Sequence, residues 1–215
     1  MFTKIEDNND PFEMNLSQYI AKKVLLRIYQ GEYVDGDRII EEEIANKYNV
    51  SRGPVREALF MLEHMGVVER LPRRGVVVKK YTDEEILQFF NVFKEIMLIS
   101  VRYSKKYWTK EHGLELKKHI KKIQLACESK NLLDYDEAMD KIFRFLIATS
   151  RNKVLLKFYN ETSIILGAFS RTKLNSNNMT FTLNNLVAIE FAINQNEWDE
   201  ALNHLENMLQ NTIEL

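Results

Sequence analysis

The chain has 215 residues, of which 45% are hydrophobic and 28% charged, so it can fill the core of one large domain or two modest ones and is not disordered. Its longest apolar runs, such as residues 163–169, fall short of the roughly 18 to 20 residues that span a bilayer, which excludes a membrane segment. The formal net charge is −1, so overall charge does not indicate nucleic acid, and any case for DNA depends on local charge.

The amino-terminal segment and the cysteine content indicate the cellular compartment. Residues 1–15 are acidic and lack the basic start, apolar stretch and cleavage site of a secretory signal, so we expect a cytoplasmic protein. The single cysteine, Cys127, can form neither an internal disulfide nor a cysteine-based zinc site. A lone thiol on a helix usually acts as a small buried hydrophobic group.

Three short helices are predicted before residue 66. Apolar residues recur at helical spacing over residues 16–30 and again over residues 40–48. After a tight turn, a third helix is expected from Ser51, a favourable N-cap, to about residue 65, where Gly66 ends it. Pro54 stands in the first turn of this helix, where its missing N–H costs nothing.

A basic hairpin follows these helices. Two β-branched runs, 67–71 and 76–79, are separated by Pro72, Arg73, Arg74 and Gly75, which predicts a two-stranded hairpin. Residues 51–80 carry seven basic side chains and three acidic ones, so this stretch is a candidate phosphate-binding face. Three helices plus a two-stranded β wing describe a winged helix-turn-helix.

The third helix and the hairpin tip hold the side chains suited to DNA. Arg52 and Arg56 are four residues apart and share one helix face, and each guanidinium matches guanine O6 and N7, or a phosphate, with two hydrogen bonds. At the tip, Gly75 permits a sharp turn and a close approach of Arg73 and Arg74 to a phosphate. One short helix contacts few bases, so we expect a two-fold dimer on a palindromic duplex.

An all-helical region is expected from Thr82 onward, which makes the protein mainly α. The polar stretch 174–179 is interpreted as a surface loop. We therefore predict a DNA-binding domain over residues 1–80 and an all-α domain of six or seven helices over residues 81–215. The expected helices lie near 83–107, 110–129, 132–149, 153–172, 180–195 and 197–213.

The stretch from Gly36 to Val78 resembles the DNA-binding domain of the GntR family of bacterial regulators. The resemblance is carried by Gly36-Asp37, the SRGPVREAL segment 51–59 and the PRRG segment that ends at Gly75. Glu42 stands where some members have an arginine. Whether this position contacts DNA is therefore left open. The residues that the resemblance implies as DNA contacts are Ser51, Arg52, Pro54, Arg56, Arg74 and Gly75.

The helical region resembles the FadR subfamily with its FCD-type effector domain, through residues 140–143, Asn152 and residues 188–209. In many relatives an aspartate and three histidines bind a divalent metal, which holds a carboxylate effector. Here Asp140 is kept, but the three histidine positions carry Arg144, Leu186 and Met208. Neither an arginine nor a leucine can ligate a metal, and a thioether is a poor ligand, so we expect no metal and no cofactor. The implied effector pocket consists of Asp140, Arg144, Leu186 and Met208.

Asp140 and Arg144 allow more than one interpretation. Their i, i+4 spacing predicts an intrahelical ion pair, but Arg144 facing a pocket would instead bind an anionic effector directly. Two further interpretations remain. The pocket is closed and holds no effector, or it holds a bulky apolar ligand such as a fatty acyl thioester. His112 and His119 are interpreted as lying on a solvated helix face rather than as a ligand pair. The aromatic and methionine stripes are interpreted as core: Phe89, Phe90, Phe93, Met97, Phe143, Phe145, Phe158 and Phe169.

These patterns predict a sequence-specific transcription regulator, a repressor, that binds palindromic operator DNA as a homodimer. A small-molecule effector, such as an organic anion, would control it from the helical domain. The alternative is an effector-independent or partner-controlled dimeric DNA-binding protein whose helical domain only dimerises. We expect no enzymatic activity, because the sequence offers no nucleophile–base pair, no phosphate-binding glycine loop and no complete metal set.

Overall fold

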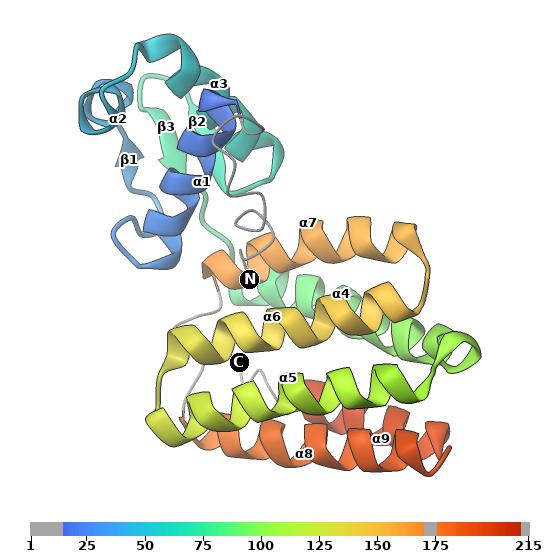
Figure 1. The fold of residues 1–215 in the computed structure, drawn as a ribbon. Coiled ribbons are helices and arrows are strands. Elements are labelled where there is room, and N and C mark those ends of the chain that lie inside the picture. Colours follow the sequence, from blue (N-terminus) through green and yellow to red (C-terminus); the bar gives the residue numbers. More distant parts are fainter. Residues whose placement is uncertain (1–14, 170–175, 212–215) are drawn as a thin grey trace. The chain divides into compact units, whose positions relative to one another are not determined.

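The computed structural model describes residues 15–169 and 176–211, and the chain divides into two compact units (Figure 1). The winged-helix unit contains residues 15–86 together with residues 164–169, and the bundle unit contains residues 87–163 and 176–211. The predicted fold class is confirmed, since helices dominate and the only sheet of the described residues is small. Within those residues, no helix is long and apolar enough to cross a membrane.

The winged-helix unit has the predicted order of helices. A capping box formed by Asn15 and Gln18 starts the first helix, and Asn49 ends the second in the left-handed region with a φ of 53°. Such a residue closes a helix tightly and allows the next one to begin within three residues. The elements are α1 (Leu16–Tyr29), β1 (Arg38–Ile39), α2 (Glu41–Tyr48), α3 (Arg52–His64), β2 (Val68–Leu71) and β3 (Gly75–Val78).

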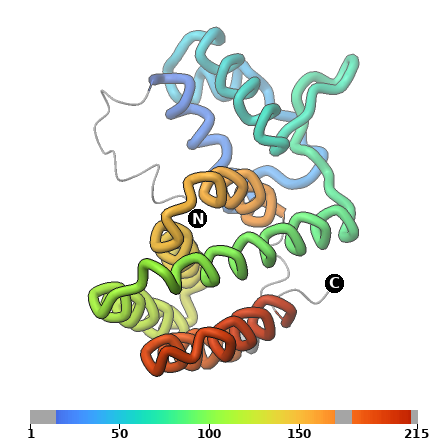
Figure 2. The backbone as a smooth tube through the Cα atoms, turned by 90° about the vertical axis from the view of Figure 1, so that its right-hand side faces the viewer, coloured from blue at the N-terminus to red at the C-terminus, as the bar shows by residue number. Residues whose placement is uncertain are grey.

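The wing is part of a three-stranded antiparallel sheet in the order β1-β3-β2. The predicted hairpin is present, with Leu71 opposite Gly75, and Figure 2 shows it as an arm beyond the end of α3. The third strand, β1, pairs Arg38 with Val77 and was not predicted. Two residues are too short for an alternating pattern, so only the pairing with β3 reveals this strand.

The core of the winged-helix unit lies between α1 and α3. Ile20, Val24, Val55 and Leu59 are fully buried there. The end of α7 (Lys153–Phe169), which no sequence pattern placed here, also belongs to this unit. The Tyr29 hydroxyl donates to the backbone oxygen of Ile164 over 2.8 Å, and the Tyr81 and Phe169 rings lie 4.9 Å apart.

The bundle unit consists of long helices whose predicted bounds largely agree with the structure. Helix α5 packs against both α6 and α8, and α8 packs against α9. The helices are α4 (Asp83–Ser104), α5 (Lys110–Ser129), α6 (Leu132–Thr149), α7 (Lys153–Phe169), α8 (Ser176–Asn194) and α9 (Trp198–Gln210), with a 3₁₀ turn at Lys105–Tyr107.

Two predictions for the bundle need correction. The stretch 174–179 is not a loop throughout, because α8 begins at Ser176; residues 174 and 175 lie outside the described residues. Met179 explains the difference, since its side chain is only 3% exposed and anchors the first turns of α8 in the core. Phe158 is not core, because 48% of it is exposed, whereas Phe93, Phe143 and Tyr159 form mutual ring contacts inside the bundle.

Candidate nucleic-acid interface

Helix α3 presents one apolar and one basic face. Val55, Leu59 and Leu62 recur at helical spacing and are buried, which directs the intervening positions outward. Arg52 and Arg56 lie on this outward side, with 55% and 64% of their side chains exposed. The structure therefore places both predicted reading residues on one accessible face of the helix.

Each of these arginines contacts a carboxylate from the first turn of α2. The Arg52 Nη2 atom lies 3.0 Å from Oε1 of Glu42, and Nε of Arg56 donates to Oε2 of Glu41 over 2.7 Å. Solvent-exposed ion pairs contribute about 0 to 1 kcal/mol, so a phosphate or a guanine edge can replace either carboxylate. Sequence reasoning missed both pairs, although the run of three glutamates that opens α2 was visible.

The start of α3 leaves polar groups available. Ser51 is the N-cap residue, with extended backbone, but its exposed hydroxyl makes no capping hydrogen bond. Pro54 is the third residue of α3 and is half-buried. Its missing N–H breaks no helical bond, because the first turn of a helix has no acceptor for such groups. This end of α3 thus combines a hydroxyl, open backbone amides and two arginines.

The wing tip is a tight turn that projects two cations. The Arg74 amide donates to the backbone oxygen of Leu71 over 3.2 Å, and Arg73 and Gly75 have positive φ values of 64° and 78°. Both arginine side chains are exposed, and neither forms an ion pair with any residue in the described ranges. Free guanidinium groups on a projecting turn are suited to phosphates.

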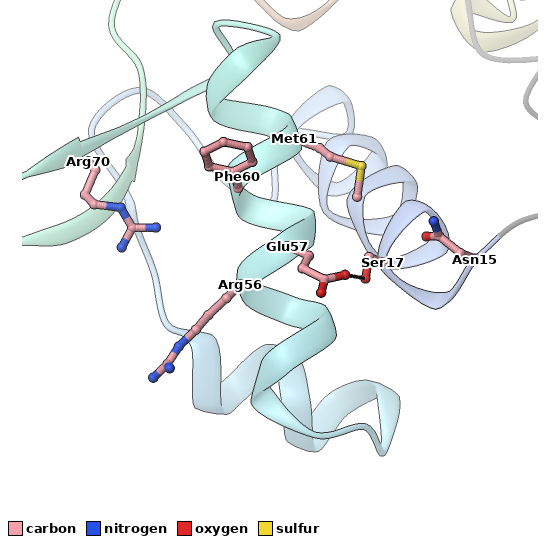
Figure 3. A pocket seen from close by; sticks show the side chains of 7 residues that line it. All are labelled: Asn15, Ser17, Arg56, Glu57, Phe60, Met61 and Arg70. Carbon is pink, nitrogen blue, oxygen red and sulfur yellow. Dashed lines mark hydrogen bonds between the residues drawn. The ribbon is translucent and has the colours of Figure 1, made fainter.

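A hollow of about 500 Å³ lies beside α3 in the same unit (Figure 3). Arg56 and Arg70 extend on the same side of α3, although Arg70 comes from β2. On the other side, the Ser17 hydroxyl donates to Glu57 over 2.6 Å. Sequence analysis counted Arg70 in the basic segment but did not assign it to the site. The hollow is lined by Asn15, Ser17, Arg56, Glu57, Phe60, Met61 and Arg70.

The second predicted site lies in the bundle unit, where Asp140 and Arg144 form the expected ion pair. Nε of Arg144 donates to Oδ2 of Asp140 over 2.8 Å, while its Nη1 donates to Asn160 over 2.7 Å. The Tyr159 hydroxyl donates to the other Asp140 oxygen over 2.6 Å. Both α7 partners were missed, because nothing in the sequence shows which face of α7 meets α6.

The other two predicted pocket residues are core side chains. Leu186 on α8 is 1% exposed and Met208 on α9 is fully buried. Asp140 itself is 2% exposed, so this part of the bundle is well packed around a satisfied ion pair. Among the described residues, no group of three or more histidine, cysteine, aspartate or glutamate side chains is placed to hold a metal ion.

The histidine prediction is wrong for His119. Its side chain is only 15% exposed and its ring lies 5.4 Å from that of Phe145, so it does not lie on a solvated face. Burial lowers the pKa of His119 below its ordinary value of 6.5, and its Nδ1 atom is buried without a hydrogen-bond partner. His112 instead completes a capping box with Thr109 at the start of α5.

Known proteins similar to this chain have the same kind of amino-terminal unit. Residues 16–78 match the family model described as bacterial regulatory proteins, gntR family. This match covers less than a third of the chain, so the similarity to a gntR-family domain concerns this segment. The matched segment includes α1, α3 and the whole wing, and therefore every residue of the candidate interface from Ser51 to Gly75.

Curated proteins similar to this chain are named as transcription regulators. The chain is 28% identical over 111 residues to the HTH-type transcriptional repressor RspR of Escherichia coli K12, which is 52% of this chain and 49% of RspR. It is 37% identical over 73 residues to the gluconate operon transcriptional repressor of Bacillus subtilis 168, 34% of this chain and 30% of that protein. The chain thus spans about half or less of the length of these curated relatives.

The fold is similar to that of a solved structure over almost its whole length. The Escherichia coli McbR/YncC structure superposes with a TM-score of 0.78, covering 92% of this chain and 94% of that chain, at 17% identity. At this identity the likeness concerns the fold alone, and it extends over both the winged-helix unit and the bundle unit.

Proposed function

We propose that this protein is a sequence-specific DNA-binding transcription regulator, a repressor, that acts as a homodimer on a palindromic operator. The observation that carries the proposal is the basic surface of the winged-helix unit, where Arg52 and Arg56 project from α3 and Arg73 and Arg74 project from the wing. RspR and the gluconate operon repressor, both named as transcriptional repressors, support the regulatory role.

The geometry of α3 suits the major groove of B-DNA. The groove is about 12 Å wide and admits one helix. Arg52 and Arg56 are separated by one helical turn of about 5.4 Å, so they reach neighbouring base steps or a base and a phosphate. The Ser51 hydroxyl and the first amides of α3 would donate hydrogen bonds to a phosphate at this end of the helix. Arg74 and Gly75 then contact the sugar-phosphate backbone along the wing.

We infer that the two carboxylates of α2 adjust this recognition. Glu41 and Glu42 hold Arg56 and Arg52 in defined positions before DNA arrives. On binding, each arginine exchanges a carboxylate for a phosphate or base, while the carboxylates repel nearby phosphates. Such repulsion weakens contacts with any duplex, and only the bidentate base contacts of the correct sequence compensate for it.

For the remainder of the chain, we propose an effector and dimerisation domain of the FadR subfamily over residues 81–215, following a DNA-binding domain over residues 1–80. Arg144 provides a half-buried positive charge at the position of a family metal ligand, and an organic anion would compete with Asp140 for its guanidinium. Binding there would shift the spacing of two DNA-binding units and so change operator affinity.

The packing in the bundle favours a second candidate function for this domain. Asp140 accepts hydrogen bonds from Arg144 and Tyr159, and Leu186 and Met208 are core residues. A helical domain that serves only dimerisation, with control by protein partners or by none, fits this closed arrangement. Titration of the full chain with a panel of organic acids separates the two, because only the first candidate predicts a ligand whose affinity falls in the Arg144→Met variant.

Selection from a randomised duplex library tests the DNA-binding proposal. We expect the purified full chain to enrich a palindromic sequence, and the Arg56→Ala variant to bind it more than tenfold more weakly, since a lost bidentate contact costs about 1 to 3 kcal/mol. The control is Lys121→Ala, which removes one exposed cation from α5 in the bundle and is expected to leave affinity unchanged. No enrichment above random sequence would exclude sequence-specific binding.

A further inference from the structure

A basic hollow of about 490 Å³ opens in the bundle unit, apart from the two sites described above. It is formed where α4 ends and α7 begins. The segments 101–110 and 149–157 contribute seven basic residues and no acidic one, although the whole chain has a net charge of −1. Four of these cations line the hollow directly: Arg102, Lys106, Arg151 and Lys153.

These four cations lack counter-charges of their own. Each is exposed, and none forms an ion pair with a side chain in the part of the chain that the structure describes. Elsewhere in the bundle unit, basic side chains do find acidic partners, as Lys118 does with Glu115 and Lys141 does with Glu137. Four like charges around one hollow repel one another, so an anion of at least two charges would relieve the repulsion.

Two tyrosines add flat apolar surface to the same hollow. The Tyr107 ring has Lys106 at 5.4 Å and Arg151 at 4.7 Å from its centroid, which holds both cations near the opening. Tyr103 is 52% exposed and offers a ring at the wall. An aromatic ring of a ligand can stack there, an interaction that contributes strongly to the binding of nucleotide bases.

Hydrogen bonds next to the hollow connect the helices that form it. The buried hydroxyls of Ser104 and Thr149 lie 2.7 Å apart and join the end of α4 to the end of α6. Asn152 then caps α7 by accepting from the amides of Val154 and Leu155 over 3.0 and 3.4 Å. The positive end of the α7 dipole therefore faces the same opening as the cations.

We propose that this hollow binds an organic phosphate, a small molecule that carries a phosphate or diphosphate and a ring, as a nucleoside diphosphate does. Arg102, Lys106, Arg151 and Lys153 contact the phosphate oxygens, since guanidinium and ammonium groups are the usual phosphate ligands. Tyr103 stacks on the ring. The volume lies within the range of small-molecule sites, about 300 to 1,000 Å³. This inference is independent of the DNA-binding proposal.

Isothermal titration calorimetry of the full chain with ADP, pyrophosphate and succinate tests the proposal. We expect ADP and pyrophosphate to bind, and the Lys106→Gln/Arg151→Gln variant to raise both dissociation constants at least tenfold, because each lost charge-assisted hydrogen bond weakens binding by about tenfold. Tyr103→Ala is expected to weaken ADP but not pyrophosphate. The control Lys121→Gln/Lys122→Gln removes two exposed charges from α5 and is expected to change neither.

Several results would overturn the site. Succinate binding as tightly as ADP would show a general anion surface rather than a phosphate site. Equal ADP affinity in the wild type and the Lys106→Gln/Arg151→Gln variant, with circular dichroism confirming that both are folded, would place ADP elsewhere. A loss of duplex-DNA affinity in that variant, without ADP binding to the wild type, would assign the cations to DNA. The absence of a binding heat with both ADP and pyrophosphate would also refute the proposed phosphate site.

Discussion

Replacing Arg144 with methionine tests the buried ion pair of α6. Methionine keeps most of the side-chain volume but removes the guanidinium that donates to Asp140 and Asn160. The Asp140 side chain is only 1% exposed, so its carboxylate would keep the Tyr159 hydroxyl and lose the ion pair with Arg144. Breaking a buried pair in this way costs about 3 to 5 kcal/mol, and the 19% exposure of Arg144 favours the lower end.

Urea unfolding of the full chain, followed by far-ultraviolet circular dichroism, measures this cost. We expect Arg144→Met to lose about 3 kcal/mol of stability, and the double variant Asp140→Asn/Arg144→Met to recover most of it, because no buried charge remains. The control is Lys141→Met on the same helix, whose pair with Glu137 is more exposed and contributes less than about 1 kcal/mol. If Arg144→Met behaves like Lys141→Met, or if the double variant is no more stable than the single one, the buried-pair reasoning is refuted.

Four further predictions follow from the described residues. Glu42→Ala is expected to tighten binding to any duplex severalfold at low salt, because it removes a carboxylate beside the phosphates; fluorescence anisotropy at two salt concentrations measures this, and unchanged affinity counts against it. Gly75→Ala is expected to destabilise the wing by about 1 to 2 kcal/mol and weaken DNA binding, since its φ is 78° while no atom lies closer than 3.7 Å to the added carbon. Burial lowers the pKa of His119, so the stability that its neutral ring supports is complete above pH 6.5 and declines as the pH falls below that value. Urea midpoints at pH 7.5 and 5.5 are expected to differ more in the wild type than in His119→Gln, and equal differences would refute this. Excess chelator is expected to leave the melting temperature unchanged, because Arg144 occupies a family metal-ligand position; a clear drop would show a bound metal.

Long amphipathic helices were the part of the fold best predicted from the sequence. Helices α5 and α6 have the predicted bounds, because periodic apolar residues and capping residues mark their ends. Features that depend on contacts between distant segments were missed. Strand β1 consists of two residues that only β3 identifies, and residues 164–169 join the winged-helix unit through contacts such as that of Tyr29.

The candidate interface could be predicted for the same reason. Its residues are close together in the sequence, so the helix period and the hairpin turn suffice to place Arg52, Arg56 and the wing arginines on exposed positions. What the sequence could not show is the pairing across elements. The contact of Arg52 with Glu42 depends on the packing of α2 against α3, and the partners of Arg144 depend on the packing of α6 against α7. Burial of His119 likewise results from the ring of Phe145 on another helix.

The specificity ratio of the full chain tests the central claim most directly. It is the affinity for the duplex selected from the random library divided by the affinity for a scrambled duplex of equal length, measured at one fixed salt concentration. The account predicts a ratio of at least about 10³ for the wild type, falling more than tenfold in Arg56→Ala but staying nearly constant in Arg74→Ala, which weakens both duplexes alike. A wild-type ratio near one, or a ratio that Arg56→Ala leaves unchanged, would contradict sequence reading by α3.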